Sequence, residues 1–394
     1  MYAKYYSLCV AMLLLVLNPY TVVGPLGYYA ATVFTFLGIV FLKEKKLQTM
    51  LLCFLICVII SVFGVIISYF NNITQFEHLK VSLSILLYYI IGFGLFSMYG
   101  KRFKLDEILL ISLLVVVLNS IIILVQVEVP SFRGSIESFF VPSGNIDWAD
   151  GLRYRGIASG GGASLSLLSA VACYISLYLY SIKKINMVFL VFTNLIFLFS
   201  IFFIGRTGLL LIFISYTLVF FKLATTNVKR AVLFLITFLF FIILLFDFIE
   251  TFLVDQYGEE FFRYTLGFML DGRDGFEKEG TVGVLAEFLT VVPKQFPEII
   301  TGYGFYGGSD FYPWTDSGYS RMFLSVGYLL GIFFYFCIFY IFIKSSRGSL
   351  IIFLPLFAML LVAEAKEGML LSGYASRLFF ILMGFYVCQK LPTK

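Results

Sequence analysis

The chain has 394 residues, of which 61% are hydrophobic and only 13% are charged, and its mean hydropathy is +0.98. This composition excludes a soluble globular protein of this length and predicts a polytopic membrane protein. The net charge is +5, but no basic tract or RNA-reading motif accompanies it, so nucleic acid is not an expected partner. All six cysteines lie in apolar segments, which argues against a disulfide framework or a CxxC metal site.

Hydropathy windows of about 19 residues give roughly twelve apolar spans along the chain. The first span resembles a signal peptide, but no small-residue cleavage site ends it, so we expect a membrane span. The expected spans are 5–23, 26–42, 48–70, 80–99, 107–129, 162–182, 186–204, 208–222, 231–250, 318–343, 349–363 and 369–389. The predicted fold is an all-α polytopic membrane protein, with residues 1–394 forming a single transmembrane domain.

Lysine-rich turns predict the orientation of these spans. The segments KEKK, KRFK, SIKK, KLATTNVKR, IKSSRG and QKLPTK fall on one side, which the positive-inside rule places in the cytoplasm with both termini. This parity requires a break within 186–222, because one helix of that length would measure about 54 Å against a hydrocarbon core of about 30 Å. The motif GRTG at 205–208 is the expected break. Two long segments, about 130–161 and 251–317, are expected to form outer lids, and VGVLAEFLTVVPKQF in the second is expected to form a short amphipathic helix.

The arginines are distributed differently from the lysines. In this topology 13 of the 17 lysines, but only three of the 11 arginines, fall in the cytoplasm. The positive-inside rule does not explain the difference, because it treats Lys and Arg alike. Arg presents a planar fork of donors that matches phosphate and carboxylate oxygens two at a time. The sequence therefore predicts an anionic ligand near the outer face, where eight arginines lie: Arg133, Arg153, Arg155, Arg206, Arg263, Arg273, Arg321 and Arg377.

Three of these arginines adjoin glycine-rich turns. Arg153 and Arg155 precede the turn that opens span 162–182, where backbone amides and guanidinium groups together would suit an anion. The alternative is that the glycines allow close helix packing and the arginines anchor at headgroups. Arg206 lies between two apolar spans, a costly position that favours a ligand contact, although a snorkelling turn residue is the alternative.

The second lid ends in TGYGFYGGSDFYPWTDSGYSRMFLSVGYLLG. Its glycines do not indicate a dinucleotide site, because no strand precedes them. Asp316 is close to Arg321 and is either a catalytic base or the N-cap and ion-pair partner of the following helix. The aromatic residues either form an interfacial belt or stack on sugar rings. They are Tyr303, Phe305, Tyr306, Phe311, Tyr312, Trp314 and Tyr319.

Further charges precede and enter the last span. Glu364, Lys366 and Glu367 of the turn EAKEG, and Arg377 beyond it, form either a buried charge network or part of the ligand site. His78, the single histidine, lies in a short outer loop and is expected at the surface. No outer cluster has Asp, Glu and His at metal-ligand spacing, and no DxD motif occurs there, so a metal is not expected.

These motifs, in this order, resemble the O-antigen and capsular polysaccharide polymerases of the Wzy type and their relative, the O-antigen ligase. The resemblance covers most of residues 150–390 and includes R-x-G before a central span, GRTGLLL, GYGF, DSGYSRMFLSVGYLLG and KEG. It implies a fold similar to the C-type glycosyltransferases, no metal or other cofactor, and an active site facing the outside of the bacterial inner membrane. In the ligase a histidine sits where the late loop enters the next span, and Asp316 at that position favours the polymerase.

The resemblance implies that undecaprenyl diphosphate-linked oligosaccharides are donor and acceptor, and that they enter from the lipid bilayer. Arg155 and Arg206 would stabilise the leaving diphosphate, and Asp316 would take the proton from the acceptor hydroxyl. The expected substrate-binding residues are Arg153, Arg273, Arg321, Tyr303, Trp314, Tyr319, Lys366, Glu367 and Arg377. A lipid-linked oligosaccharide flippase or other transporter is the alternative from another class. The sequence leaves open whether a chain-length regulator is a partner.

Overall fold

The computed structural model of the chain describes residues 2–73, 75–141, 153–205, 207–226, 281–307 and 314–390, with isolated positions between 232 and 258. Arg206, Arg273, nearly all of the expected span 231–250 and about half of the second lid lie outside the described residues.

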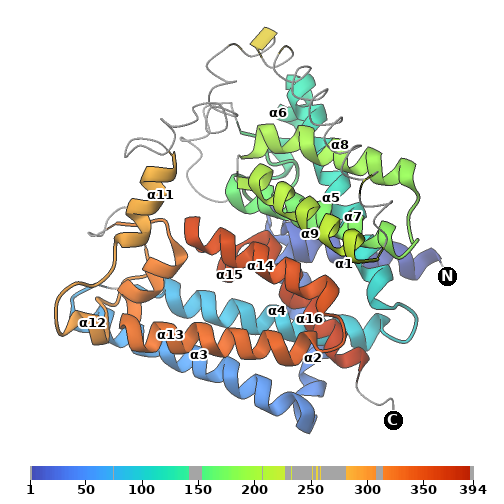
Figure 1. The fold of residues 1–394 in the computed structure, drawn as a ribbon. Coiled ribbons are helices and arrows are strands. Elements are labelled where there is room, and N and C mark those ends of the chain that lie inside the picture. The colour runs from blue at the N-terminus through green and yellow to red at the C-terminus, as the bar shows by residue number, and fades with distance from the viewer. Residues whose placement is uncertain are drawn as a thin grey trace.

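The described part of the chain is almost entirely helical (Figure 1). Its first half contains α1 (Tyr2–Leu17), α2 (Leu26–Ile39), the 3-10 turn η1 (Val40–Lys43), α3 (Lys45–Phe70), α4 (Glu77–Tyr99), α5 (Leu105–Glu128) and α6 (Pro130–Phe139). The second half contains α7 (Ala163–Ser181), α8 (Met187–Ile204), α9 (Thr207–Thr226), α11 (Thr281–Thr290), α12 (Glu298–Thr301), α13 (Gly318–Ser346), α14 (Leu350–Lys366), α15 (Met369–Ser372) and α16 (Tyr374–Gln389).

Six of the described helices are long and apolar enough to cross a membrane: Leu47–Phe70 of α3, then α4, α5, α7, α8 and α13. Their outward faces remain apolar, with Val188 79% and Leu329 70% exposed. Polar side chains instead turn inward, as where buried Asn194 donates to Ser176 Oγ at 3.0 Å. An apolar exterior around inward-facing polar side chains is the pattern that lipid requires. The protein is an all-α membrane protein.

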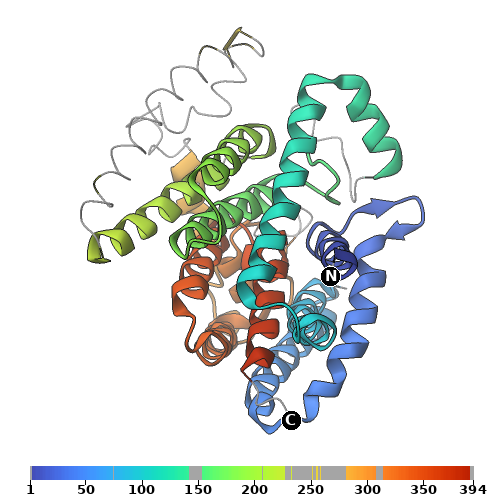
Figure 2. The same cartoon turned by 90° about the vertical axis from the view of Figure 1, so that its right-hand side faces the viewer.

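Three helix boundaries differ from the expected spans. The helix α1 ends at Leu17 instead of continuing to 23, because Asn18 adopts a left-handed φ of 45°. A hairpin follows, in which β1 (Tyr20–Thr21) pairs antiparallel with β2 (Gly24–Pro25). A bridge from Thr21 to Phe140 places the hairpin beside the end of α6 (Figure 2). The last span is divided into α15 and α16 at Gly373.

The third difference is a break inside α13. Gly327 has φ 75° and ψ 175°, so the helix is interrupted between its first two turns and its long remainder. Carbonyl groups freed by such a break need new partners in a membrane protein. Residues 302–307 of the second lid, which we call the late loop, supply them. Tyr303 N donates to Leu324 O at 2.6 Å, and Gly304 N donates to Ser325 O at 3.1 Å. The segment 302–307 is therefore fixed to α13.

The contacts between helices α4 and α16 show which turns lie at the same end of the molecule. Phe96 lies against Phe385, with ring centroids 5.6 Å apart, and Arg377 lies 5.8 Å from the ring of Tyr88. The two helices thus run parallel, and small residues let them approach, since a Cβ on Gly92 would collide with the backbone of α16. Their last turns meet at one end.

Lysine-rich turns gather at that end. Ser349 Oγ donates to Tyr386 OH at 2.6 Å, which brings the turn between α13 and α14 to the end of α16. Tyr5 of α1 meets Phe103 of the turn 101–104, with ring centroids 5.5 Å apart. We call this the lysine-rich end, and it lies at the right of Figure 1.

Candidate functional site

The start of α13 lies at the opposite end and carries an ion pair. Arg321 Nη2 donates to Asp316 Oδ1 at 3.0 Å, and Arg321 Nε donates to the carbonyl of Thr315 at 3.0 Å. The N-cap is Ser317, whose hydroxyl accepts from Ser320 N at 3.5 Å. Asp316 is therefore an ion-pair partner of this helix but not its N-cap, and its role as a base stays a prediction. Its side chain stays 38% exposed.

The turn between α14 and α15 packs against this helix start. Glu364 is fully buried and accepts hydrogen bonds from Tyr335 OH at 2.8 Å and from Leu370 N at 2.7 Å. A Cβ on Gly318 would collide with the Glu364 carboxylate, so the glycine at the start of α13 allows this contact. Glu364 thereby joins α13, α14 and α15 from within.

Lys366 connects the same turn to the start of α9. Its Nζ donates to Thr207 Oγ1 at 2.7 Å. Thr207 directly follows Arg206, so this contact lies one residue away from Arg206 in the sequence. The turn itself interrupts the stretch 186–222 where the length argument placed the break, since α8 ends at Ile204 and α9 begins at Thr207.

Several charged residues act on the carboxyl of Glu367. Burial raises the pKa of its carboxyl above the ordinary value, and the positive charge of Lys366 opposes this rise. Asp316, Arg321 and Arg153 also lie near enough to act on this carboxyl. Five of the residues singled out by sequence are therefore linked by the electrostatics of this carboxyl. We call Arg153, Asp316, Arg321, Lys366 and Glu367 the polar cluster; it contains three cations and two carboxylates.

Arg155 has a different environment from Arg153. It is 9% exposed, and its guanidinium donates to the carbonyls of Ala158, at 2.8 Å, and Phe140. These bonds close the glycine-rich turn on itself and tie it to the end of α6. Through these bonds Arg155 stabilises the conformation of the glycine-rich turn.

Two polar residues of α5 hold the same turn, and sequence reasoning did not select them. Asn119 Oδ1 accepts from Ile157 N at 2.9 Å, and Gln126 Oε1 accepts from Gly156 N at 3.1 Å. Both are nearly fully buried. Their spacing in the sequence could have indicated this role, because two amide side chains seven residues apart in an apolar span share one helix face.

The glycine-rich turn also contacts the turn between α8 and α9. Gly208 N donates to Ser166 Oγ at 3.2 Å, and a Cβ on Gly205 would lie 3.2 Å from the backbone of Gly162. The start of α7 and the start of α9 therefore lie side by side, next to Lys366. The side chains of Arg206 and Arg273 lie outside the described residues, so their roles stay predictions.

The aromatic residues near the polar cluster differ in their exposure and contacts. Trp314 is 40% exposed and meets Phe288 edge-on, with ring centroids 4.9 Å apart. Tyr319 donates its hydroxyl to the carbonyl of Leu361 at 2.9 Å. Tyr303 stacks on Phe305, with ring centroids 5.7 Å apart. Of the three predicted sugar-binding rings, Trp314 offers the most open face.

The late loop continues from these rings to the cluster. Gln75 Nε2 donates to Gly307 O at 2.8 Å, and Tyr306 N donates to Gln75 Oε1 at 3.0 Å. A Cβ on Gly307 would lie 3.1 Å from Arg321 Nε. The segment 302–307 is therefore held between α13 and the start of α4, directly beside the Asp316–Arg321 pair.

His78 is buried, so the expectation of a surface residue was wrong. Its side chain is 3% exposed, its Nδ1 lies 3.0 Å from Ser325 Oγ, and its ring stacks on Tyr306 at 5.1 Å. The late loop covers it, and this tertiary contact leaves no trace in local sequence.

Arg377 lies apart from the contacts described for the cluster. Its guanidinium is 5.0 Å from the ring of Tyr374, whose hydroxyl accepts from Gly160 N. Arg377 thus connects to the glycine-rich turn through Tyr374.

No group of three or more His, Cys, Asp or Glu side chains suited to a metal ion occurs in the parts of the chain described above. Comparison of the chain with protein-family models, curated proteins and solved structures gives no significant match.

Proposed function

We propose that the protein is a polysaccharide polymerase that joins polyprenyl diphosphate-linked oligosaccharide repeat units at the outer face of the bacterial plasma membrane. The polar cluster is the observation that carries this proposal. Cations and carboxylates from before α7, from the start of α13 and from the end of α14 converge at the end opposite the lysine-rich turns. This combination suits a reaction in which an anion leaves and a hydroxyl is deprotonated.

The orientation follows from the positive-inside rule. Placing the lysine-rich end in the cytoplasm puts the polar cluster at the outer face. In this topology the shorter helices α1, α2, α9, α14 and α16 also cross the bilayer, together with residues 231–250, giving twelve spans with both termini inside. The membrane then delivers a lipid-linked substrate to the cluster at headgroup level.

Recognition of the diphosphate is assigned to the cations that converge there. Arg321 and Arg153 supply guanidinium donors, Lys366 supplies a point charge, and Arg206 adjoins Thr207, to which Lys366 is bonded. Negative charge grows on the diphosphate as it leaves, so donors aimed at it stabilise the transition state more than the ground state. Arg155 acts as a positioning residue that keeps the glycine-rich turn in place, and Arg273 keeps its proposed contact with the substrate.

The bond changes can be written in full. The acceptor hydroxyl gives its proton to a carboxylate, and its oxygen forms a bond to the anomeric carbon of the donor. The bond from that carbon to the diphosphate breaks, and the diphosphate leaves with the electron pair. Asp316 is the proposed base, because it is partly exposed and oriented by Arg321. Glu367 is the second candidate, since burial raises the pKa of its carboxyl and makes it the stronger base.

The break in α13 favours a second candidate function, a transporter of lipid-linked oligosaccharides. Broken helices are typical of secondary transporters, where their ends bind the substrate. In this chain the freed carbonyls of Leu324 and Ser325 are already paired with the late loop. We therefore rank transport second.

Purified protein in vesicles that contain only lipid-linked repeat units separates these functions. A polymerase converts the repeat units into a ladder of longer glycans. A transporter changes their sidedness but not their length, and a ligase makes no ladder without a second glycolipid acceptor. Arg321→Ala is the matched inactive variant, and Arg102→Ala is its control because Arg102 is exposed at the lysine-rich end. Absence of a ladder with folded native protein contradicts the proposal.

A further inference from the structure

A cavity of about 340 Å³ opens at the lysine-rich end, far from the polar cluster. Three helices line it. Thr49 and Met50 come from the start of α3, Val387 lies in α16, and Lys390 directly follows α16. The end of α13 contributes Tyr340, Lys344, Ser345 and Arg347. We call this cavity the basic pocket.

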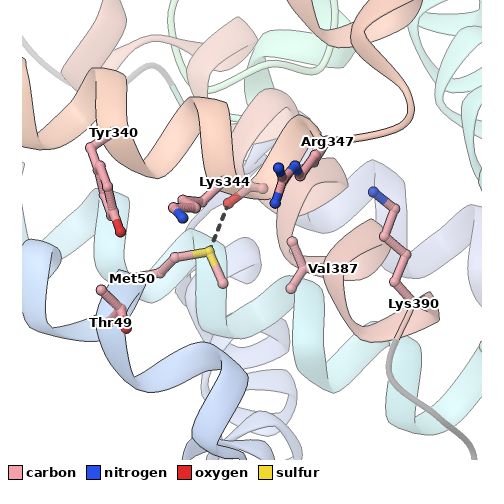
Figure 3. Close-up of a pocket in the computed structure, with 8 residues that line it drawn as sticks. Thr49, Met50, Tyr340, Lys344, Arg347, Val387 and Lys390 are labelled. Atoms are coloured by element: carbon pink, nitrogen blue, oxygen red, sulfur yellow. Dashed lines mark hydrogen bonds between the residues drawn. The ribbon is translucent and has the colours of Figure 1, made fainter.

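Three cations border the basic pocket. Figure 3 shows the nitrogen ends of Lys344, Arg347 and Lys390 in a row along one edge of it. All three side chains are exposed. Across the described part of the chain, no carboxylate forms an ion pair with any of the three. Three neighbouring cations that form no ion pair favour binding of an anion.

The cations are held in position by their surroundings. Lys390 Nζ lies 4.1 Å from the ring of Tyr386, and Lys344 Nζ lies 5.4 Å from the ring of Tyr340. Gly348, with φ 89°, allows the turn after Arg347 to fold back, and a Cβ there would lie 3.3 Å from Lys390 Nζ. The turn thereby brings a cation from α16 next to the two from α13.

The opposite wall of the basic pocket is apolar and fixed. Met50 Sδ accepts hydrogen bonds from Ser345 Oγ at 3.2 Å and from Tyr89 OH at 3.3 Å. These bonds hold the Met50 side chain beside Val387. A ligand in the pocket would therefore meet positive charge on one side and hydrocarbon on the other, which suits an amphipathic anion.

An apolar path leads from the basic pocket along α13 into the expected bilayer. Phe336 lies one turn before Tyr340 and is 63% exposed, and Ile343 beside Lys344 is 47% exposed. At helical spacing Phe336, Tyr340 and Lys344 share one face. An acyl chain on this face would place its headgroup at the cations.

We propose that the basic pocket binds the phosphate group of an anionic phospholipid headgroup, with an acyl chain lying along α13. Basic pockets between membrane helices on the cytoplasmic side are suited to such headgroups. A free phosphate offers the same charge but would leave the apolar wall and the Phe336 face without a partner. The site is separate from the polar cluster and does not depend on the proposed polymerase activity.

The test compares lipids retained by the purified protein. Native mass spectrometry in detergent, with equal phosphatidylglycerol and phosphatidylcholine added, should show preferential retention of phosphatidylglycerol. A variant with Lys344→Gln, Arg347→Gln and Lys390→Gln should lose about tenfold of that preference, since each cation near a phosphate contributes to binding. A matched control carries Lys101→Gln, Arg102→Gln and Lys184→Gln, which remove the same charges from other exposed turns at this end.

Two further arms identify the ligand. Phe336→Ser should weaken retention of phosphatidylglycerol while leaving the weak binding of inorganic phosphate unchanged. The lipid assignment would be overturned if inorganic phosphate bound as tightly as the lipid and Phe336→Ser weakened the binding of neither. Equal loss of preference in the pocket variant and the matched control would overturn the pocket itself, because the effect would then follow net charge. Circular dichroism confirms that each variant is folded, and Lys344→Arg with Lys390→Arg should retain the preference.

Discussion

Thr207 accepts a hydrogen bond from Lys366 at 2.7 Å, across 159 positions of sequence. This bond joins the turn between α8 and α9 to the turn between α14 and α15, the two turns that sequence reasoning singled out separately. It places the backbone on both sides of Arg206 at the polar cluster, and it makes Arg206 the first residue to test.

We expect Arg206→Lys and Arg206→Ala both to be inactive, because Lys keeps the charge but loses the paired donors that grip a diphosphate. Loss of one charge-assisted bond to the leaving group should slow turnover by roughly 10²–10³-fold. Polymer ladder formation at matched protein level measures this. Arg102→Lys is the control and should be indistinguishable from native. A normal ladder with Arg206→Lys would make Arg206 a packing residue.

The pH profile distinguishes the two candidate bases. A base must be deprotonated to act, so activity falls as pH drops through its pKa. Burial raises the pKa of Glu367 above the ordinary Glu value of about 4.3, so with Glu367 as the base activity should already fall at a pH above that value. Glu367→Gln should then abolish turnover, and Asp316→Asn should only reduce it. If Asp316 is the base, the two variants exchange these outcomes.

The same shift predicts a change in stability. Because the folded state raises the Glu367 pKa, its ionised form is disfavoured on folding, and this cost appears as pH rises through the unfolded pKa. Glu367→Gln should therefore unfold at an equal or higher temperature than native near neutral pH, and the difference should vanish in acid. A thermal unfolding series in detergent checks it, and a lower melting temperature at neutral pH would show that Glu367 is held by favourable contacts instead.

Asn119→Leu should destabilise the glycine-rich turn. It leaves Ile157 N–H without its acceptor and Arg155 C=O without its donor, and each unpaired buried group costs about 1–3 kcal/mol. Leu118→Ala, on an exposed face of the same helix, is the comparison. Denaturant titration measures the difference. Equal stability of the two variants would mean that the turn finds other partners.

Polymerisation should survive chelation, since the outer segments offer no recognisable set of metal ligands. Purified protein is assayed for ladder formation with and without EDTA. Loss of activity that Mg²⁺ or Mn²⁺ restores would contradict the proposed metal-independent reaction.

The sequence predicted features that follow from length and hydropathy. The break near 205–208 was predictable because a continuous helix would overrun the bilayer, and the helical class followed from composition. The sequence also predicted a short helix over VGVLAEFLTVVPKQF, of which the structure contains the first part as α11, ending at Thr290. These inferences need no knowledge of which helices are neighbours.

Features that depend on tertiary contact were not predictable. His78 is buried because the late loop, 228 positions later in the chain at Tyr306, folds over it. Arg155 bonds to Phe140 O, which lies 15 positions earlier in the chain. The N-cap at Ser317 instead of Asp316 reflects a one-residue choice between two suitable caps, which propensity does not resolve.

The pairing of Tyr303 and Gly304 with the interrupted part of α13 has a consequence for engineering. If the proposed function holds, exchange of the second lid with that of another protein is a route to new sugar specificity, and the motif GYGF is a natural place for the N-terminal boundary of such an exchange. Such a graft would replace backbone that completes a transmembrane helix. A workable boundary keeps residues 298–307 with the recipient and confines the exchange to sequence outside them.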